Sequence, residues 1–271
     1  MARSAPVATL DGWTKSSFTG GGLTHDVYEK GSGPGVVLIP EMPGMTPEVL
    51  GLGQHLVDSG FTVAVPSPFG TPGRERTAGY LLRTITRVCV SAEFRMLALN
   101  AHRPITDFLR AVAADLAARS PGAGVGVIGM CFTGGFALAT AIEGSVLASV
   151  VSQPAVPFPI SRARRLDPGA SAEEMDAIAA RTVDDGLCLL GLRFSEDISA
   201  PRARFAGLKE KLGDAFEVIE LDSSAGNTGG YGKRAHSVLT DEVRETPPNS
   251  AYETREHVVE FLRKNISREA D

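Results

Sequence analysis

Cys131 stands where a short apolar run gives way to a helical pattern, and this position favours nucleophilic chemistry. The run Val125–Ile128 is rich in β-branched residues, Gly129 precedes the cysteine, and Gly134 and Gly135 follow it. A strand, a sharp turn and a helix in this order make a nucleophile elbow, which needs small residues around the reactive side chain. The helix N-terminus would favour the thiolate, which is the attacking form. A buried structural cysteine is the alternative, since cysteine is among the most buried residue types.

A cysteine nucleophile needs a general base, and His236 is the strongest candidate among the five histidines. It follows the last predicted strand, in a loop rich in glycine that could carry it over the elbow. An exposed loop histidine without a catalytic role is the alternative. The other histidines fall in a predicted hairpin or in predicted helices, where surface or packing roles are expected: His25, His55, His102 and His257.

An orienting carboxylate should follow the preceding predicted strand, Leu187–Leu192, and both Glu196 and Asp197 do so. Asp197 stands four residues before Pro201, which opens the next predicted helix. Its shorter side chain suits a fixed orienting role, so we predict Asp197 as the acid. The resulting chain order of nucleophile, acid and histidine is that of α/β-hydrolases.

A second carboxylate, Glu41, follows the buried strand Val36–Ile39, which would place it beside the elbow. On spacing alone, a catalytic role and the capping of a turn are equally consistent. The loop after this strand also supplies an oxyanion donor in such folds. The N–H groups of Met42 and Phe132 are the expected pair, because Pro43 has no N–H to donate.

The segments around these residues alternate between strands and helices. An antiparallel hairpin is expected first, from Thr14–Thr19 and Leu23–Glu29 around three consecutive glycines. Continuous apolar runs then mark strands that are buried on both faces. These strands are Val36–Ile39, Phe61–Val65, Val125–Ile128, Val146–Val151, Leu187–Leu192 and Phe216–Leu221. The alternation predicts a mostly parallel sheet with helices on both faces, and ligand sites in such sheets lie beyond the carboxyl ends of the strands.

Helix signals fill the connections. Thr46 is an N-cap before Pro47, and Gly60 is the stop of that helix. A helical pattern also covers Tyr80–Leu99, and further helices are expected at about 105–116, 201–212 and 251–265. In the long segment 154–185, the pattern Ser-Ala-Glu-Glu from Ser171 predicts a helix that could form a cap over the site. We interpret residues 1–271 as one α/β domain with this candidate cap segment.

Composition argues against several classes of protein. The net charge is −5 and the basic residues are scattered, so nucleic acid is not an expected partner. The apolar runs are too short to span a bilayer, and the N-terminus lacks the apolar core of a signal peptide. Three widely spaced cysteines do not make a disulfide framework, and no metal-binding motif such as CxxC or HExxH is visible. We expect a soluble cytoplasmic protein without a metal or membrane partner.

Together these residues resemble the dienelactone hydrolase family over nearly the whole chain. The elbow 129–135 is similar to the family's Gly-x-Cys-x-Gly-Gly, and the segment 36–41 to its strand followed by a glutamate. The segments 61–68, 197–201 and 235–237 are similar to its next strand, its acid loop and its histidine loop.

The resemblance implies the α/β-hydrolase fold, no cofactor, and a triad of Cys131, Asp197 and His236. It implies that Glu41 pairs with the resting thiol and assists its deprotonation when substrate binds. The expected reaction is hydrolysis of a small-molecule ester or lactone through an acyl-cysteine intermediate. A thioesterase or acyl transferase using the same triad, and a non-catalytic binding protein sharing the fold, are the alternatives.

The chain also departs from the family pattern. Thr133 stands where the family usually has glycine. Thr240 occupies the position, four residues after the histidine, where dienelactone-cleaving members have an arginine that holds the substrate carboxylate. Arg74 and Arg76 are the candidates for their second carboxylate-binding arginine. Hydrolase chemistry is therefore better supported than the dienelactone substrate.

Overall fold

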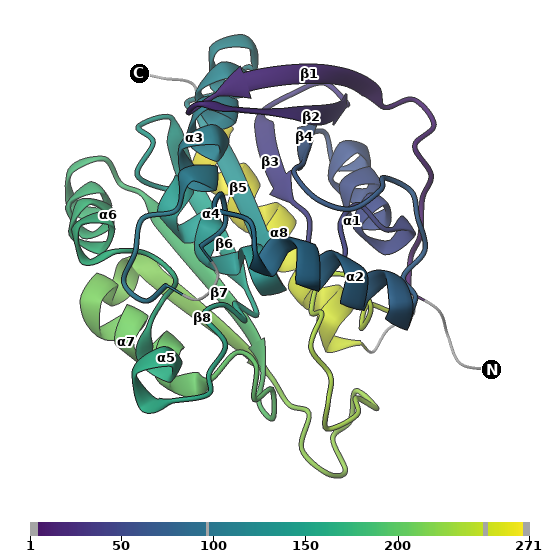
Figure 1. The fold of residues 1–271 in the computed structure, drawn as a ribbon, viewed down its shortest axis with the longest axis vertical. Helices are drawn as coiled ribbons and strands as arrows, with labels where there is room; N and C mark the ends of the chain where they lie inside the picture. Colours follow the sequence, from purple (N-terminus) through teal and green to yellow (C-terminus); the bar gives the residue numbers. More distant parts are fainter. Residues whose placement is uncertain (1–4, 96–97, 246–248, 268–271) are drawn as a thin grey trace.

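A computed structural model describes residues 5–95, 98–245 and 249–267, which form one eight-stranded sheet with helices on both sides (Figure 1). The strand order is β1-β2-β4-β3-β5-β6-β7-β8. The first two strands form the predicted antiparallel hairpin, and β2 also pairs antiparallel with β4, while all later pairs are parallel. The strands are β1 (Thr14–Gly20), β2 (Leu23–Lys30), β3 (Gly35–Ile39), β4 (Thr62–Ser67), β5 (Val125–Met130), β6 (Val146–Ser152), β7 (Cys188–Phe194) and β8 (Phe216–Leu221). This confirms the predicted fold class.

The sheet separates two hydrophobic cores, as β3 illustrates. Val37 and Ile39 belong to one core, and the alternate residues Val36 and Leu38 belong to the other. All are buried, which is why such strands read as continuous apolar runs. The core on the side of Val36 is covered by α1 (Pro47–Asp58) and α8 (Ser250–Ile266). The opposite core is covered by α2 (Ala78–Cys89), α3 (Pro104–Arg119), α4 (Gly134–Thr140), α6 (Ala172–Asp184) and α7 (Arg202–Leu212).

The helix ends follow the predicted signals except after α2. Thr46 caps α1 by accepting the N–H of Val49, and Gly60 follows the helix with φ of +94°. The helix predicted over 80–99 is shorter, since α2 ends at Cys89. Arg95 and Asn100 both have φ of +43°, a left-handed conformation that no helix interior accepts, so the prediction was wrong beyond Cys89. Residues 96–97 lie outside the described part. Along the described ranges, no helix has the length and apolar content needed to cross a membrane.

The long segment 154–185 holds α5 (Arg162–Leu166) and α6, and a capping box starts the second of these helices. Ser171 accepts the N–H of Glu174 at 3.1 Å, and Glu174 Oε2 accepts the N–H of Ser171 at 2.8 Å. Met175 and Ile178 on α6 are buried in the same core as α4. The helix therefore packs against the body of the protein.

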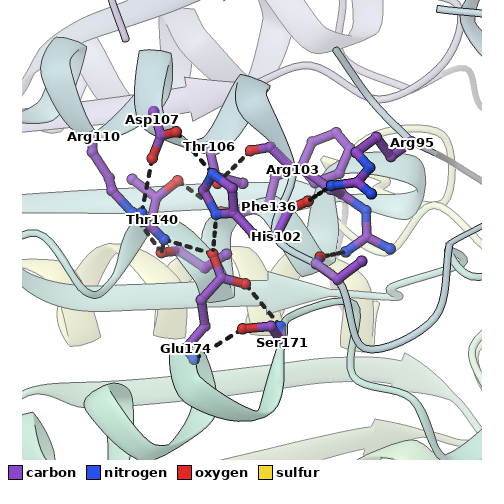
Figure 2. A network of polar contacts seen from close by, with 12 residues as sticks. Arg95, His102, Arg103, Thr106, Asp107, Arg110, Phe136, Thr140, Ser171 and Glu174 are labelled. Atoms are coloured by element: carbon purple, nitrogen blue, oxygen red, sulfur yellow. Dashed lines mark hydrogen bonds and ion pairs between the residues drawn. The ribbon is translucent and has the colours of Figure 1, made fainter. Parts of the chain in front are cut away.

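A polar network ties α6 to α3 (Figure 2). Glu174 Oε1 lies 2.9 Å from Nδ1 of His102 and accepts a hydrogen bond from Arg110 at 2.8 Å, while Nε2 of His102 lies 2.8 Å from Asp107. Partial burial lowers the pKa of His102, but the hydrogen bonds of Glu174 and Asp107 outweigh it and raise this pKa above its ordinary value. His102 thus bridges a carboxylate of α6 and a carboxylate of α3 across this interface.

Candidate active site

Cys131 lies at the carboxyl end of β5, at the apex of a sharp turn into α4. Its φ is +52°, a strained conformation for a residue other than glycine and one that marks functional sites. A Cβ on Gly129 would lie 2.3 Å from the carbonyl oxygen of Thr133, and a Cβ on Gly134 would lie 2.8 Å from Cα of Pro154. The glycines around the cysteine therefore permit the close backbone approach that an elbow requires.

Thr133, the departure from the family's glycine, links this elbow to the neighbouring strand. Its side chain is fully buried. The hydroxyl accepts the N–H of Met130 at 3.0 Å, and its proton is shared between the carbonyl oxygens of Met130 at 3.0 Å and Ile39 at 3.2 Å. Because Ile39 ends β3, this threonine fixes the loop carrying Glu41 relative to Cys131.

The histidine loop brings His236 between Cys131 and Asp197. Nδ1 of His236 lies 2.7 Å from Oδ2 of Asp197, and the ring also hydrogen-bonds to the thiol of Cys131. Oδ1 of Asp197 accepts the N–H of Ser199 at 2.9 Å, and only 4% of the Asp197 side chain is exposed. Glu196, the other carboxylate that the sequence offered, is exposed. The structure thus joins the three predicted residues in one hydrogen-bonded row.

The charges in this row act on His236. Burial lowers the pKa of His236, but Cys131 and Asp197 raise it, and the result lies well above the ordinary value. The ring thus lies between the sulfur and a buried carboxylate, where a general base for a thiol nucleophile would lie. Cys131 is therefore placed as an activated nucleophile would be.

Glu41 is buried beside this row, and its carboxylate is held by hydroxyls of the histidine loop. Oε2 accepts the Ser237 hydroxyl at 2.8 Å, and Oε1 accepts the Thr240 hydroxyl. The hydrogen bonds that Glu41 makes with described side chains thus go to these two hydroxyls, while the thiol of Cys131 is paired with His236. The residue that replaces the family's arginine contributes one of these hydroxyls.

These groups meet in a cavity of about 190 Å³, which is called the catalytic cavity below. Met42 and Phe132, the predicted sources of oxyanion N–H groups, both line it. Apolar side chains from α2 and from the start of 154–185 make up much of the remaining wall. The lining residues are Glu41, Met42, Arg76, Leu81, Ile85, Cys131, Phe132, Ala155, Val156, Phe158, His236 and Ser237.

The two candidate arginines face different spaces. Arg76 lines the catalytic cavity and forms an ion pair with Asp241. Burial lowers the pKa of Arg76, but the charges of Glu41 and Asp241 outweigh it and raise this pKa. Arg74 instead stacks over the ring of Tyr80 and faces a second cavity. The only one of the two that reaches the catalytic cavity within the described residues already has an acidic partner.

Several residues of the site were not predicted from the sequence. Ser237 stands directly after His236, and this spacing alone could have marked it as a neighbour of the site. Leu81, Ile85 and Phe158 carry no comparable signal, because apolar residues on an amphipathic helix or in a loop are equally typical of a core. Only the folded chain shows that they line the cavity.

Comparison with known proteins supports this description of the fold. A sequence profile of the dienelactone hydrolase family matches residues 24–264. No curated protein matches the chain in sequence. Among solved structures, a dienelactone hydrolase-like promiscuous phosphotriesterase from metagenomic libraries is similar, with a TM-score of 0.64, 17% identity, and coverage of 94% of this chain and 98% of that chain.

Two further structures show the same likeness. A protein of Klebsiella pneumoniae subsp. pneumoniae whose name places it among the dienelactone hydrolases aligns with a TM-score of 0.61 and 18% identity, over 92% of this chain and 97% of that chain. A dienelactone hydrolase of Anabaena variabilis aligns with a TM-score of 0.57 and 12% identity, over 94% of this chain and 98% of that chain. At such identities the likeness establishes the fold.

Proposed function

Because the chain belongs to the dienelactone hydrolase family of α/β-hydrolases, we propose that it hydrolyses uncharged esters or lactones with a catalytic triad of Cys131, His236 and Asp197. The observation that carries this proposal is the hydrogen-bonded row of the three side chains, of which Cys131 and His236 line one cavity. The 2.7 Å contact between His236 and Asp197 orients the ring, whose other polar partner is Cys131.

In the proposed mechanism, His236 takes the proton of the Cys131 thiol, and the sulfur attacks the carbonyl carbon and forms a tetrahedral oxyanion. The N–H groups of Met42 and Phe132, which line the cavity, stabilise this charge. Protonated His236 donates its proton to the departing alcohol oxygen, which leaves an acyl-cysteine. Neutral His236 then removes a proton from water, the hydroxide attacks the acyl carbon, and the acid and the thiolate are released.

The lining of the cavity supports an uncharged substrate. Arg76 is paired with Asp241, and Thr240 donates its hydroxyl to Glu41, so neither position offers an unmatched cation to a carboxylate. Leu81, Ile85 and Phe158 present apolar surface instead. The similar folds include proteins named as a phosphotriesterase, an acylaminoacyl peptidase and an esterase, so the fold leaves the substrate open.

Nucleophilic attack by a cysteine needs a free thiol. Cys89, Cys131 and Cys188 are all free thiols. A thiol nucleophile is best preserved in a reducing compartment, so we propose that the enzyme acts in the cytoplasm.

Trapping of the acyl-cysteine tests the proposed function directly. The purified protein is mixed with p-nitrophenyl esters, lactones and thioesters, quenched in acid, and its peptides are analysed by mass spectrometry. We expect an acyl adduct on Cys131, and loss of turnover by at least about a thousandfold in Cys131→Ala. Cys89→Ala and Cys188→Ala are the matched controls and should keep their activity.

Other outcomes identify the alternatives. Turnover that survives in Cys131→Ala while a control variant loses it contradicts the assignment of the nucleophile. Faster release of acyl product to an added thiol or amine than to water identifies an acyl transferase. Absence of any adduct across the panel, with alkylation of Cys131 no faster than that of free cysteine, indicates a binding protein.

A further inference from the structure

A second cavity in the described part of the chain is lined by arginines and lies apart from Cys131. It has a volume of about 570 Å³ and is formed mainly by the loop after β4, by α2 and by residues 91–94. Its guanidinium groups come from Arg74, Arg83 and Arg87. None of the residues that line it lines the catalytic cavity, so it is a separate space.

The arginines of this cavity have no acidic partner within the described ranges. Arg83 and Arg87 lie one helical turn apart on α2, so their side chains share one face. The carboxylate that lines the cavity, Glu93, lies 3.2 Å from Nε2 of His25. The lining carries three arginines against one carboxylate. The three arginines are exposed to solvent, and no carboxylate within the described residues forms an ion pair with them.

Arg74 is held at the rim of the cavity by Tyr80. The guanidinium carbon lies 4.3 Å from the centroid of the Tyr80 ring, a cation–π contact. The Tyr80 hydroxyl accepts the N–H of Thr71 at 2.5 Å and donates to the carbonyl oxygen of Pro43 at 3.3 Å. Arg74 is exposed, but the ring beneath it is buried and its hydroxyl is held by two backbone groups, so the guanidinium rests on a fixed support.

The helix α2 forms a wall between the two cavities. Leu81 and Ile85 on one face line the catalytic cavity, whereas Arg83 and Arg87 on another face line the second cavity. Phe69, which lines the second cavity, packs edge-on against Phe132, with 5.6 Å between ring centroids. A molecule in the second cavity would thus be separated from Cys131 by packed side chains.

We propose that this cavity binds a small phosphomonoester, distinct from the ester substrate. A phosphomonoester carries about −1.5 to −2 charge near neutral pH, which matches the unmatched charge of the lining. Planar guanidinium groups bind phosphate oxygens with paired hydrogen bonds. The volume lies within the range of small-molecule sites, about 300–1,000 Å³, and Phe69 and Val88 offer apolar surface to the organic part. A nucleic acid is a poorer fit, because the protein as a whole carries a net charge of −5.

Isothermal titration calorimetry with phenyl phosphate tests the proposal, and phenol serves as the uncharged control at the same salt concentration. We expect saturable binding of phenyl phosphate and none of phenol. The variant Arg83→Gln/Arg87→Gln should bind at least about tenfold more weakly, because charge-assisted hydrogen bonds are lost. The control variant Arg162→Gln/Lys264→Gln removes the same charge from exposed positions on α5 and α8 and should bind like the wild type.

Alkylation of Cys131 by iodoacetamide shows, in the same assay, in which of the two cavities phenyl phosphate binds. Phenyl phosphate should bind the alkylated protein unchanged, and Arg83→Gln/Arg87→Gln should keep its ester turnover within about twofold. The proposal is overturned by a lack of saturable binding, by equal weakening in the control variant, or by loss of binding on alkylation. Since binding is measured without turnover, these results do not depend on the proposed hydrolase activity.

Discussion

Replacement of Asp197 by asparagine tests the proposed triad most sharply, because the two carboxylate oxygens have separate donors. Oδ1 accepts the N–H of Ser199 at 2.9 Å, and Oδ2 faces Nδ1 of His236 at 2.7 Å. In Asp197→Asn, the amide oxygen should stay with Ser199, because an amide NH₂ placed there would face another donor. The NH₂ group then faces Nδ1 of His236, which must lose its proton. The remaining ring proton moves to the nitrogen beside Cys131, where it blocks acceptance of the thiol proton.

The expected fall in kcat/KM follows from the interactions that Asp197→Asn removes. Loss of a charge-assisted hydrogen bond costs about 1.5–3 kcal/mol, which corresponds to roughly 10- to 150-fold in rate. The unfavourable tautomer adds to this cost, and the same exchange in serine proteases lowers kcat about ten-thousandfold. A thiol ionises more readily than a hydroxyl, so that figure is the upper limit here. We expect kcat/KM to fall by between about 100-fold and 10,000-fold, with little change in KM.

Steady-state kinetics on an uncharged p-nitrophenyl ester, measured from acid to alkaline pH, provide the assay. Glu196→Gln is the matched control, because it changes the neighbouring carboxylate, which is exposed. We expect this control to keep kcat/KM within about twofold. The reasoning is refuted if Asp197→Asn stays within about threefold of the wild type, or if Glu196→Gln is equally impaired.

Further predictions address the surroundings of the triad. Thr240→Val should lower the free energy of unfolding by about 1.5–3 kcal/mol in denaturant titrations, since buried Glu41 loses a donor, whereas Thr240→Ser should not. Glu41→Gln should speed alkylation of Cys131 by iodoacetamide, because a nearby negative charge disfavours the thiolate, and should lower kcat, because the hydrogen bonds that hold Ser237 and Thr240 of the histidine loop become weaker; unchanged values would make Glu41 structural. His102→Asn should lower Tm at acid pH and not at alkaline pH, because a raised pKa stabilises the fold below the ordinary value and this contribution is lost as pH rises through the folded-state value. Between matched lactones with and without a carboxylate, the uncharged one should have the higher kcat/KM, because Arg76 is already paired; a clear preference for the acid contradicts this.

The parts of the site that depend on sheet topology were accessible from the sequence. The β-branched run before Gly129 and the glycines after Cys131 predict a strand, a turn and a helix because each signal is local. Parallel strands bring their carboxyl ends to one edge, so residues that follow different strands converge there. This is why Cys131, Asp197 and His236 could be named as partners, and the structure places them in hydrogen-bonded contact.

Side-chain directions in irregular segments were not accessible in this way. Arg74 and Arg76 stand two positions apart in a loop, yet one faces the second cavity and the other the catalytic cavity. The hydroxyl of Thr240 donates a hydrogen bond to Glu41, which stands 199 positions earlier in the chain. Loops have no hydrophobic periodicity to reveal such orientations, because their backbone angles vary from residue to residue. For the same reason, the composition of the segment after α2 did not show that the helix ends at Cys89.

The two threonines that depart from the family pattern, Thr133 and Thr240, both form hydrogen bonds at the carboxyl end of β3 or just after it. Thr133 connects the elbow to the carbonyl oxygen of Ile39, and Thr240 connects the histidine loop to Glu41, two residues further along. The oxyanion donor Met42 lies next to Glu41, so it is positioned by both contacts. A carboxylate held by hydroxyls is drawn toward the histidine loop, which leaves the thiol of Cys131 to pair with His236. Under the proposed mechanism, these substitutions favour a resting site in which the proposed nucleophile, base and oxyanion donor are already in place, without a rearrangement of Glu41 before attack.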